Sequence, residues 1–340
     1  MESVTSGSLD LAIVIVNYGT QALLRDCLLS VYDSRLDDGE PGSTARVQLR
    51  VCVVDNASPD DSAEMVRAEF PQAQLIANQQ NAGYPQGNNQ GLRYFGFRNP
   101  GEAGPATAEL PSYALLLNPD TVLPPGALRA MVSFMESHPI AGVAGPKLVR
   151  LDGSLDKACR RSFPTPETSL WHLTRVDKLF PRSRRFGRYD LTYLDPDVVT
   201  QVDAVVGAFM LVRREAIAQA GLLDETFFMY GEDLDWAKRI SDAGWQVWYN
   251  PAVTVTHIKE ASSKHSYRAR VEFYRALTIF YRKHYRADTP FWMDWLIRGG
   301  IACFGGLDLL TRRLRGQVRS ATPTGLPVAA NRTKNQESPP

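Results

Sequence analysis

The sequence Tyr113-Ala114-Leu115-Leu116-Leu117-Asn118-Pro119-Asp120 joins an apolar run to a polar turn that carries a carboxylate. An unbroken apolar run of this kind is typical of a strand buried on both faces of a parallel sheet. Open α/β sheets bind their ligands at the carboxyl ends of such strands. The stretch therefore predicts an α/β protein with a ligand site beside Asp120.

Similar apolar runs occur on both sides of this stretch, and helical patterns alternate with them. We expect strands at residues 11–16, 51–54, 74–77 and 140–144, with further apolar strand segments at 202–212, 245–249 and 253–257. Helices are expected at 20–34, from Asp60 or Asp61 to about 70, and at 90–97, 213–220 and 232–243. The segment 150–197 is irregular and rich in arginine. The alternation predicts a doubly wound, mostly parallel sheet.

The C-terminal region has a different pattern. A helical, Arg- and Tyr-rich segment covers about 267–285, and an apolar stretch follows at 291–310. Asp294, Arg298 and Asp308 make this stretch a poor membrane span, although aromatic residues and arginines suit a membrane surface. We expect a catalytic domain at 1–265 and a disordered tail at 316–340. Between them, a helical extension at 266–315 either packs on the catalytic domain or contacts the inner face of a membrane.

The composition indicates a globular protein and excludes some classes of partner. The chain is 44% hydrophobic and has a formal net charge of +1, so nucleic acid is not an expected partner. Its four cysteines contain no Cys-x-x-Cys pair and are expected to be reduced thiols of a cytosolic protein. Residues 1–10 carry no Lys or Arg and lead into a strand rather than a secretion signal. A cytoplasmic location is expected, and the oligomeric state is not indicated.

Two acidic segments and one histidine are candidates for chemistry. Asn118 and Asp120 form either a common turn or the ligand set of a hard divalent cation. The cluster Gly231-Glu232-Asp233-Leu234-Asp235 opens a helix, where the helix dipole favours acids. The aromatic run at 227–230 before it would shield a carboxylate, raise its pKa and suit it to act as a general base. His257 ends another apolar strand and is either a structural histidine or a ligand.

Polar residues also follow the first two strands. Asn17 and Tyr18 end the first, and Asp55 and Asn56 end the second. These positions suit hydrogen bonds to a nucleotide base or ribose, although turn chemistry explains them equally well.

An amide-rich loop at 81–89 includes Gly83 and Asn88. It offers amide groups to an anionic or hydroxyl-rich ligand, and an ordinary entry into a helix is the alternative. The chain has neither a Gly-x-Gly-x-x-Gly fingerprint nor a P-loop at these places.

Taken in order, these segments resemble an inverting glycosyltransferase of family 2 with the GT-A fold. The matching stretches are Val16-Asn17-Tyr18, Val54-Asp55-Asn56-Ala57-Ser58, Asn81-Ala82-Gly83-Tyr84, Gly87-Asn88-Asn89, Leu117-Asn118-Pro119-Asp120, Val206-Gly207-Ala208-Phe209, Gly231-Glu232-Asp233-Leu234-Asp235 and Val255-Thr256-His257. The resemblance covers about residues 11–263 and is closest to the bacterial rhamnosyltransferase-like branch, which builds cell-wall and surface polysaccharides.

The resemblance implies roles for individual residues. It implies that Asp55 holds the nucleotide, that Asp120 and His257 bind the metal ion, and that Asp233 is the general base while Glu232 orients the acceptor. Asn118 stands where the family's Asp-x-Asp motif has its first acid, which leaves the identity of the metal open. Asn17 belongs to the same nucleotide pocket.

The expected activity is transfer of a sugar from a nucleotide diphosphate donor to a glycan or a lipid-linked acceptor. By resemblance, dTDP-rhamnose is the first choice of donor, ahead of UDP-sugars. The mixed oxygen and imidazole ligands suit Mn²⁺ or Mg²⁺, with a preference for Mn²⁺.

Two other functions are consistent with parts of the pattern. A sugar-phosphate nucleotidyltransferase would have a glycine-rich basic loop after the first strand, where this chain has Asn17-Tyr18-Gly19-Thr20-Gln21. A non-catalytic sugar-nucleotide-binding protein would not need Asp120, Asp233 and His257 together.

Overall fold

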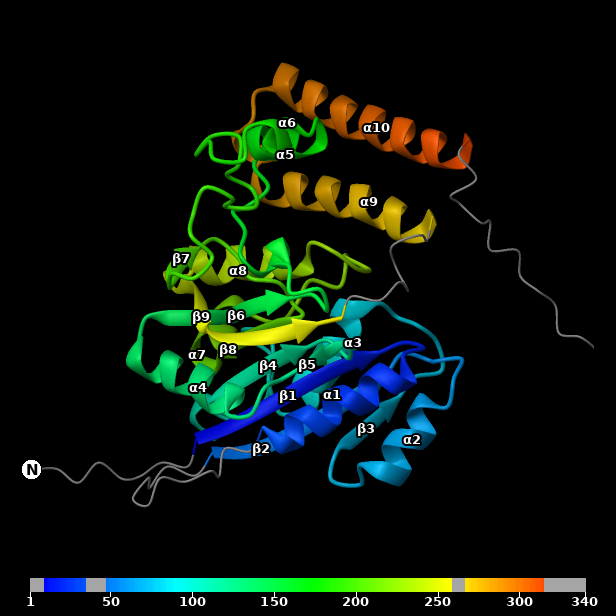
Figure 1. Cartoon of the computed structure of the whole chain (residues 1–340), viewed down its shortest axis with the longest axis vertical. Coiled ribbons are helices and arrows are strands. Elements are labelled where there is room, and N and C mark those ends of the chain that lie inside the picture. Colours follow the sequence, from blue (N-terminus) through cyan, green and yellow to red (C-terminus); the bar gives the residue numbers. More distant parts are fainter. Residues whose placement is uncertain (1–8, 35–46, 259–266, 315–340) are drawn as a thin grey trace, which may run out of the picture.

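The computed structural model describes residues 9–34, 47–258 and 267–314. Within these residues, nine strands form one sheet in the order β3-β2-β1-β4-β8-β6-β9-β5, with β7 paired to β9. Figure 1 shows the sheet in the lower part of the molecule and the C-terminal helices above it. The α/β architecture expected from the sequence is confirmed.

The first half of the sheet is parallel. β1 (Leu9–Asn17) lies between β2 (Val47–Asp55) and β4 (Tyr113–Leu117), and β3 (Gln74–Ala77) pairs with β2. The helices of this half are α1 (Gln21–Asp33), α2 (Ser62–Glu69) and α3 (Tyr84–Tyr94). The side chains of β4 and of residues 11–16 are buried, as their apolar runs predict.

The second half of the sheet is mixed. β6 (Ala141–Val149) runs parallel to β9 (Gln246–His257), and β8 (Phe209–Arg213) is antiparallel to both β4 and β6. The short strands β5 (Thr121–Val122) and β7 (Thr200–Val202) are antiparallel to β9. Helices α4 (Ala127–Ser137) and α8 (Glu232–Asp242) pack on β6 and β9, and α7 (Arg214–Ala220) packs on α8.

Some elements differ from the sequence-based expectation. α3 begins at Tyr84 rather than near residue 90, because the amide-rich segment after Gly83 is already helical. Residues 246–257 form one strand instead of two, since an irregularity in its pairing with β6, at Pro146 and Lys147, absorbs the polar break that follows Asn250. The irregular segment contains a 3₁₀ turn (Lys157–Cys159), α5 (Pro166–Leu173) and α6 (Val176–Leu179).

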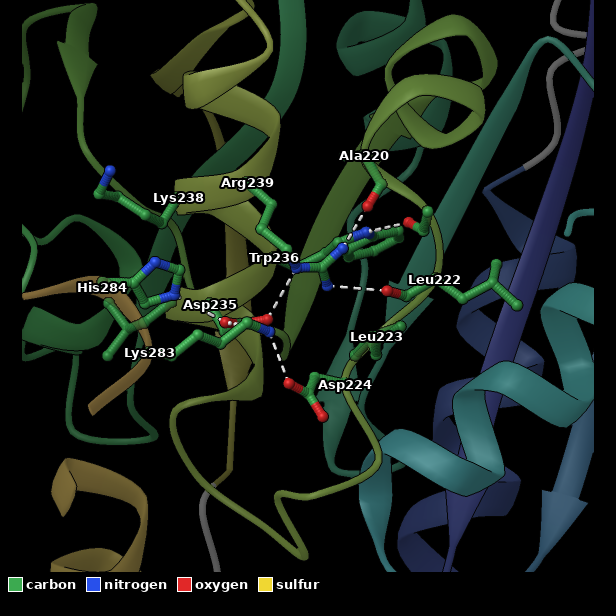
Figure 2. A network of polar contacts seen from close by, with 12 residues as sticks. Ala220, Leu222, Leu223, Asp224, Asp235, Trp236, Lys238, Arg239, Lys283 and His284 are labelled. Carbon is green, nitrogen blue, oxygen red and sulfur yellow. Dashed lines mark hydrogen bonds and ion pairs between the residues drawn. The ribbon is translucent and has the colours of Figure 1, made fainter. Parts of the chain in front are cut away.

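The C-terminal helices are α9 (Tyr267–His284) and α10 (Phe291–Leu314). Asp235, in the first turn of α8, is bonded to Arg239 of its own helix and to Lys283 and His284 of α9 (Figure 2). This network fixes α9 directly on α8. The expected boundary at residues 265–266 and the expected tail at 316–340 lie outside the described residues. No helix in the described part of the chain is long and apolar enough to cross a membrane.

Candidate active site

A cavity of about 380 Å³ lies at the carboxyl ends of β1 and β4, and the first turn of α8 and one side of α9 complete its wall. The residues expected from the sequence that line this cavity are Tyr18, Asn118, Asp120, Glu232, Asp233 and His257. They come from segments far apart in the chain. The fold therefore gathers most of the expected catalytic and metal-binding side chains at one edge of the sheet.

Asp120 and His257 face each other because two strand ends pair beside them. Thr121 of β5 is opposite His257 of β9, and the amide of Ile258 donates to the carbonyl oxygen of Asp120 at 2.8 Å. The Oδ1 atom of Asp120 lies 3.3 Å from Nε2 of His257. A carboxylate oxygen and an imidazole nitrogen placed in this way, with Asn118 on the same cavity wall, fit a divalent cation such as Mn²⁺.

A third residue fixes the orientation of this histidine. The Oδ2 atom of Asp156 lies 2.8 Å from Nδ1 of His257, and Asp156 is itself buried. Burial acts to lower the pKa of His257, but the carboxylates of Asp120 and Asp156 outweigh it and raise that pKa to about 9. The contact between Nδ1 and Asp156 turns Nε2 toward Asp120, an orientation found in many metal-binding histidines, and a bound metal ion would replace the proton on Nε2.

The acidic pair at the start of α8 is positioned by a turn with left-handed backbone. Tyr230 has φ of 68° and Gly231 has φ of 80°. A Cβ atom on Gly231 would also lie 3.3 Å from the Cβ of Ala276 in α9, so both conformation and space favour glycine. The turn places Glu232 and Asp233 in the first turn of α8, where the helix dipole stabilises negative charge.

Asp233 is held as part of a buried ion pair. Its Oδ2 atom accepts a hydrogen bond from Nη2 of Arg161 at 2.6 Å and from the amide of Gly207 at 3.1 Å. Its Oδ1 atom accepts from the amide of Leu234 at 2.8 Å. These donors stabilise the ionised carboxylate and fix its direction at the cavity wall.

Glu232 has the opposite environment. Its side chain is buried, and its Oε2 atom has no hydrogen-bond partner among the described residues. Burial, followed by the neighbouring charge of Asp233, raises the pKa of Glu232 to about 8. At neutral pH Glu232 is therefore protonated.

Two of the residues expected to bind the nucleotide, Asn17 and Asp55, are held by hydrogen bonds and lie outside the cavity lining. Asn17 donates to Oδ1 of Asp55 at 3.0 Å, and the amide of Ser58 donates to Oδ2 of Asp55 at 3.0 Å. Both Asn17 and Asp55 are buried and do not line the cavity, whereas Tyr18 is 52% exposed and does. The expected roles of Asn17 and Asp55 in donor binding stay predictions.

Asn56, Gly83 and Asn88 also lie outside the cavity lining. Asn56 donates to the carbonyl oxygen of Gly83 at 2.9 Å, and Asn88 donates to that of Tyr84 at 2.9 Å. A Cβ atom on Gly83 would lie 2.6 Å from the carbonyl oxygen of Phe228, so this close approach requires glycine. Asn56 thus joins the end of β2 to the start of α3, and Gly83 joins α3 to the loop that precedes α8. The roles of these three residues in donor binding likewise stay predictions.

A model of the family described as "Glycosyltransferase like family 2" matches residues 9–274 of the chain. The chain belongs to this family. It is 28% identical over 255 residues to the N-acetylglucosaminyl-diphospho-decaprenol L-rhamnosyltransferase of Mycobacterium tuberculosis, across 75% of this chain and 81% of that protein. It is 30% identical over 146 residues to the rhamnosyltransferase WbbL of Escherichia coli, across 43% of this chain and 52% of that protein. These relatives agree with the rhamnosyltransferase-like branch indicated by the motifs.

The fold of this glycosyltransferase has solved counterparts. The mannosyltransferase PcManGT of Pyrobaculum calidifontis, solved with GDP-Man and Mn²⁺, superimposes with a TM-score of 0.51 at 17% identity. The likeness covers 83% of this chain and 65% of that one, and it supports the GT-A type of sheet.

Sequence reasoning missed two residues of the glycosyltransferase site, Arg161 and Asp156. Arg161 is 72 residues from its partner Asp233, and Asp156 is 101 residues from His257. Both lie in the irregular segment, whose excess of arginine was the only available signal. An isolated antiparallel bridge between Arg161 and Ala204 places Arg161, a pairing too short to leave a periodic pattern.

A second group of possible ligands lies elsewhere in the glycosyltransferase. The ligand atoms of His172, Asp177 and Asp190 are within 4.8 Å of one another, and Nδ1 of His172 is 3.0 Å from Oδ2 of Asp177. None of these residues lines the cavity that contains Asp120 and Asp233. The expectation from the sequence that Asp120 and His257 bind the cation stays a prediction.

Proposed function

We propose that this glycosyltransferase transfers rhamnose from dTDP-rhamnose, with inversion, to a hydroxyl group of a glycan or lipid-linked acceptor in the synthesis of cell-wall or surface polysaccharide. The observation that carries the proposal concerns one cavity. It holds two proposed ligands of a cation, Asp120 and His257, together with a carboxylate that is fixed by hydrogen bonds, Asp233. The relatives named as rhamnosyltransferases support the choice of sugar.

The proposed reaction is a single displacement. The acceptor oxygen forms a bond to the anomeric carbon of the donor, and the bond from that carbon to the diphosphate breaks with its electron pair on the leaving nucleoside diphosphate. Asp233 takes the proton of the acceptor hydroxyl. Inversion follows because attack and departure occur on opposite faces of the same carbon.

The two carboxyl groups of α8 then have separate roles. Arg161 and the Gly207 amide hydrogen-bond to the Asp233 carboxylate and fix its direction toward the acceptor site. Glu232 is protonated at neutral pH, and its partnerless oxygen can hydrogen-bond a hydroxyl of the acceptor. Asp233 is the proposed base, and Glu232 orients the acceptor.

Asp120 and His257, with Asn118 beside them, would hold Mn²⁺ or Mg²⁺. When bound, this ion supplies positive charge that stabilises the departing diphosphate. The nucleotide would be positioned by Tyr18, which is exposed and lines the cavity, and by the hydrogen-bonded residues Asn17 and Asp55.

We also propose a cytoplasmic location with peripheral contact to the membrane. α10 exposes Phe291, Trp292, Trp295 and Leu296, of which Phe291 is 77% exposed. Aromatic side chains of this kind, interspersed with basic residues such as Arg286 and Arg298, suit the surface of a bilayer.

The test is release of nucleoside diphosphate from a panel of nucleotide sugars, with Mn²⁺ or with EDTA. Asp233→Asn should reduce turnover by about 10²-fold or more while donor binding persists, because the proton acceptor is lost. The variant also loses the charge partner of Arg161, so its folding is checked by urea unfolding. Asp242→Asn is a matched control, since Asp242 lies on the same helix, exposed and paired with Lys238.

Equal turnover by Asp233→Asn and the parent would remove Asp233 from its role. Release of nucleoside diphosphate that persists in EDTA would show that the reaction needs no divalent cation. Donor binding without turnover across glycan and lipid-linked acceptors would favour the non-catalytic alternative.

A further inference from the structure

A second cavity, of about 400 Å³, lies between α5, α9 and α10 in the upper part of Figure 1. We call it the helical groove and define it by the residues that line its long side: Leu170, Leu173, Ile297, Gly300, Ile301 and Phe304. The catalytic chemistry described above uses none of these residues. The groove therefore needs an explanation of its own.

One face of α10 is patterned to line this groove. The lining positions of α10 are 293, 296, 297, 300, 301 and 304, a spacing that places all of them on one stripe of the helix. Such an apolar stripe is normally buried against the core. Here Leu296 remains 66% exposed, so the stripe forms an open apolar wall instead.

Two of the polar side chains that line the groove, Tyr281 and Glu167, are already partnered. The hydroxyl of Tyr281 donates to Oδ1 of Asp294 at 3.1 Å, and Asp294 is paired with Arg298 at 2.9 Å. Glu167, at the edge, is paired with Arg185 at 2.7 Å. Because these groups are satisfied, the groove favours an apolar ligand over a polar one.

The groove lies next to the catalytic cavity, because two residues belong to the walls of both. Pro164 and Leu277 line both cavities. A molecule that extends from the groove past these two residues would enter the cavity lined by Asp233 and Glu232. The occupant is accordingly a molecule with a polar, reactive end and a long apolar end.

We propose that the helical groove binds the hydrocarbon chain of a lipid-linked acceptor, whose sugar reaches the catalytic cavity past Pro164 and Leu277. The inference rests on the proposed function, and it selects the lipid-linked acceptor from the two classes named there. An acyclic prenyl chain satisfies the constraints, because it is apolar along its length and is joined through a phosphate group to its sugar.

Two glycines of α10 give a matched test. Gly300 lines the groove and Gly299, its neighbour, does not; a Cβ atom at either position would meet no atom within 4 Å. Gly300→Phe should fill the groove, whereas Gly299→Phe should point its ring to solvent. Both changes remove a helical glycine, so both should fold at least as well as the parent.

The binding of farnesyl diphosphate and of dimethylallyl diphosphate is measured by calorimetry on the full chain in EDTA. The head groups are the same, so the affinity ratio reports the chain alone. The parent and Gly299→Phe should bind the longer chain about tenfold or more tightly, because more methylene groups are buried. Gly300→Phe should bring the ratio close to one.

A ratio near one in the parent would overturn the proposal, and so would a ratio unchanged by Gly300→Phe or lost equally in Gly299→Phe. Binding of nucleotide sugar with Mn²⁺ is measured on the same samples. Loss of sugar transfer with the chain-length ratio intact would refute the proposed function and leave the groove in place. Turnover of a water-soluble acceptor, together with no preference for the longer prenyl chain, would refute the role of the groove and leave the proposed function in place.

Discussion

Glu232 and Asp233 are adjacent residues with opposite electrostatic surroundings. Arg161 and two backbone amides stabilise the charge of Asp233, while burial and the charge of Asp233 oppose ionisation of Glu232. Pairs of carboxyl groups that are pushed apart in this way divide acid and base roles between them. The difference comes from the fold, because the sequence places both residues in the same helical turn.

The raised pKa of Glu232 predicts a pH-dependent stability in the absence of donor and metal. Its pKa is about 8 in the folded state against 4.5 for the unperturbed group, so its contribution to stability is complete below pH 4.5. That contribution is lost as the pH rises toward 8, at about 1.4 kcal/mol per pH unit. Urea unfolding in EDTA between pH 5 and 8 measures it. Glu232→Gln should flatten this dependence, and Glu64→Gln, an exposed control on α2, should not. An unchanged slope in Glu232→Gln would contradict the assignment.

Asp156 is a positioning residue, because it acts through His257. Asp156→Asn removes the charge that orients the ring, so Mn²⁺ should bind about 10–100-fold more weakly. Calorimetric titration of the donor-free protein with Mn²⁺ measures this without turnover. Asp152→Asn is the control, since Asp152 is an exposed acid close by in the same segment. Equal affinity in Asp156→Asn would show that the charge of Asp156 does not act on the metal site through His257.

Sequence alone pointed to Asp120, Asp233 and His257, because each lies beside the end of a strand or the start of a helix, and the fold brings them to one cavity. Their roles stay predictions. Sequence alone could not predict Arg161 or Asp156, whose partners lie far along the chain. Long-range ion pairs depend on how segments pack, and a single sequence holds no local trace of them.

Strands and helices were predictable in proportion to their length and regularity. β1 and β4 were evident because burial on both faces leaves unbroken apolar runs. β5 has two residues and no periodic signal, yet its pairing with β9 brings Asp120 to His257. The start of α3 was obscured because Gly83 and the amides that follow it are equally typical of turns.

α8 and α9 are coupled by a buried carboxylate, Asp235. Its oxygens accept hydrogen bonds from Arg239 at 2.9 Å and from His284 at 2.7 Å, and Lys283 links it to Asp224 (Figure 2). The third acid of the cluster thus joins the helical extension to the catalytic helix. Since α9 also lines the catalytic cavity, this joint fixes part of the wall.

The network predicts a contribution to stability that is lost in acid. Burial acts to raise the pKa of Asp235, but His284, Arg239 and Lys283 outweigh it and lower that pKa to about 2 from 3.8. The contribution, about 2 kcal/mol, is present above pH 4 and is lost as the pH falls toward 2. Asp235→Asn should destabilise the protein by about 2 kcal/mol at pH 7, because Arg239, Lys283 and His284 lose the buried carboxylate that they contact.

Urea unfolding at pH 7 measures the loss for Asp235→Asn, and the exposed Asp242→Asn serves as the control. A loss no larger than that of the control would show that α9 is held by its apolar contacts instead. The result would then leave the extension free to move independently of α8.

At the scale of the whole molecule, the catalytic cavity and the helical groove share α9 as a wall. The exposed aromatic residues of α10 lie on the same helical extension, away from β1, β2 and β3 (Figure 1). A lipid-linked acceptor held in a bilayer could therefore enter the groove from α10 and reach Asp233 without leaving the membrane surface. This arrangement requires that the extension, and no other face, contacts the bilayer.

The final prediction tests that orientation. Trp292 and Trp295 are each 61% exposed, so replacing both with Glu should leave the fold intact and weaken binding to phosphatidylglycerol-containing vesicles by about tenfold or more. Co-sedimentation with vesicles measures it, and Tyr94→Glu, which replaces an exposed aromatic residue on α3, is the control. If the double variant binds as the parent does, another surface makes the contact. If Tyr94→Glu weakens binding equally, the effect is one of net charge, and the extension has no special role.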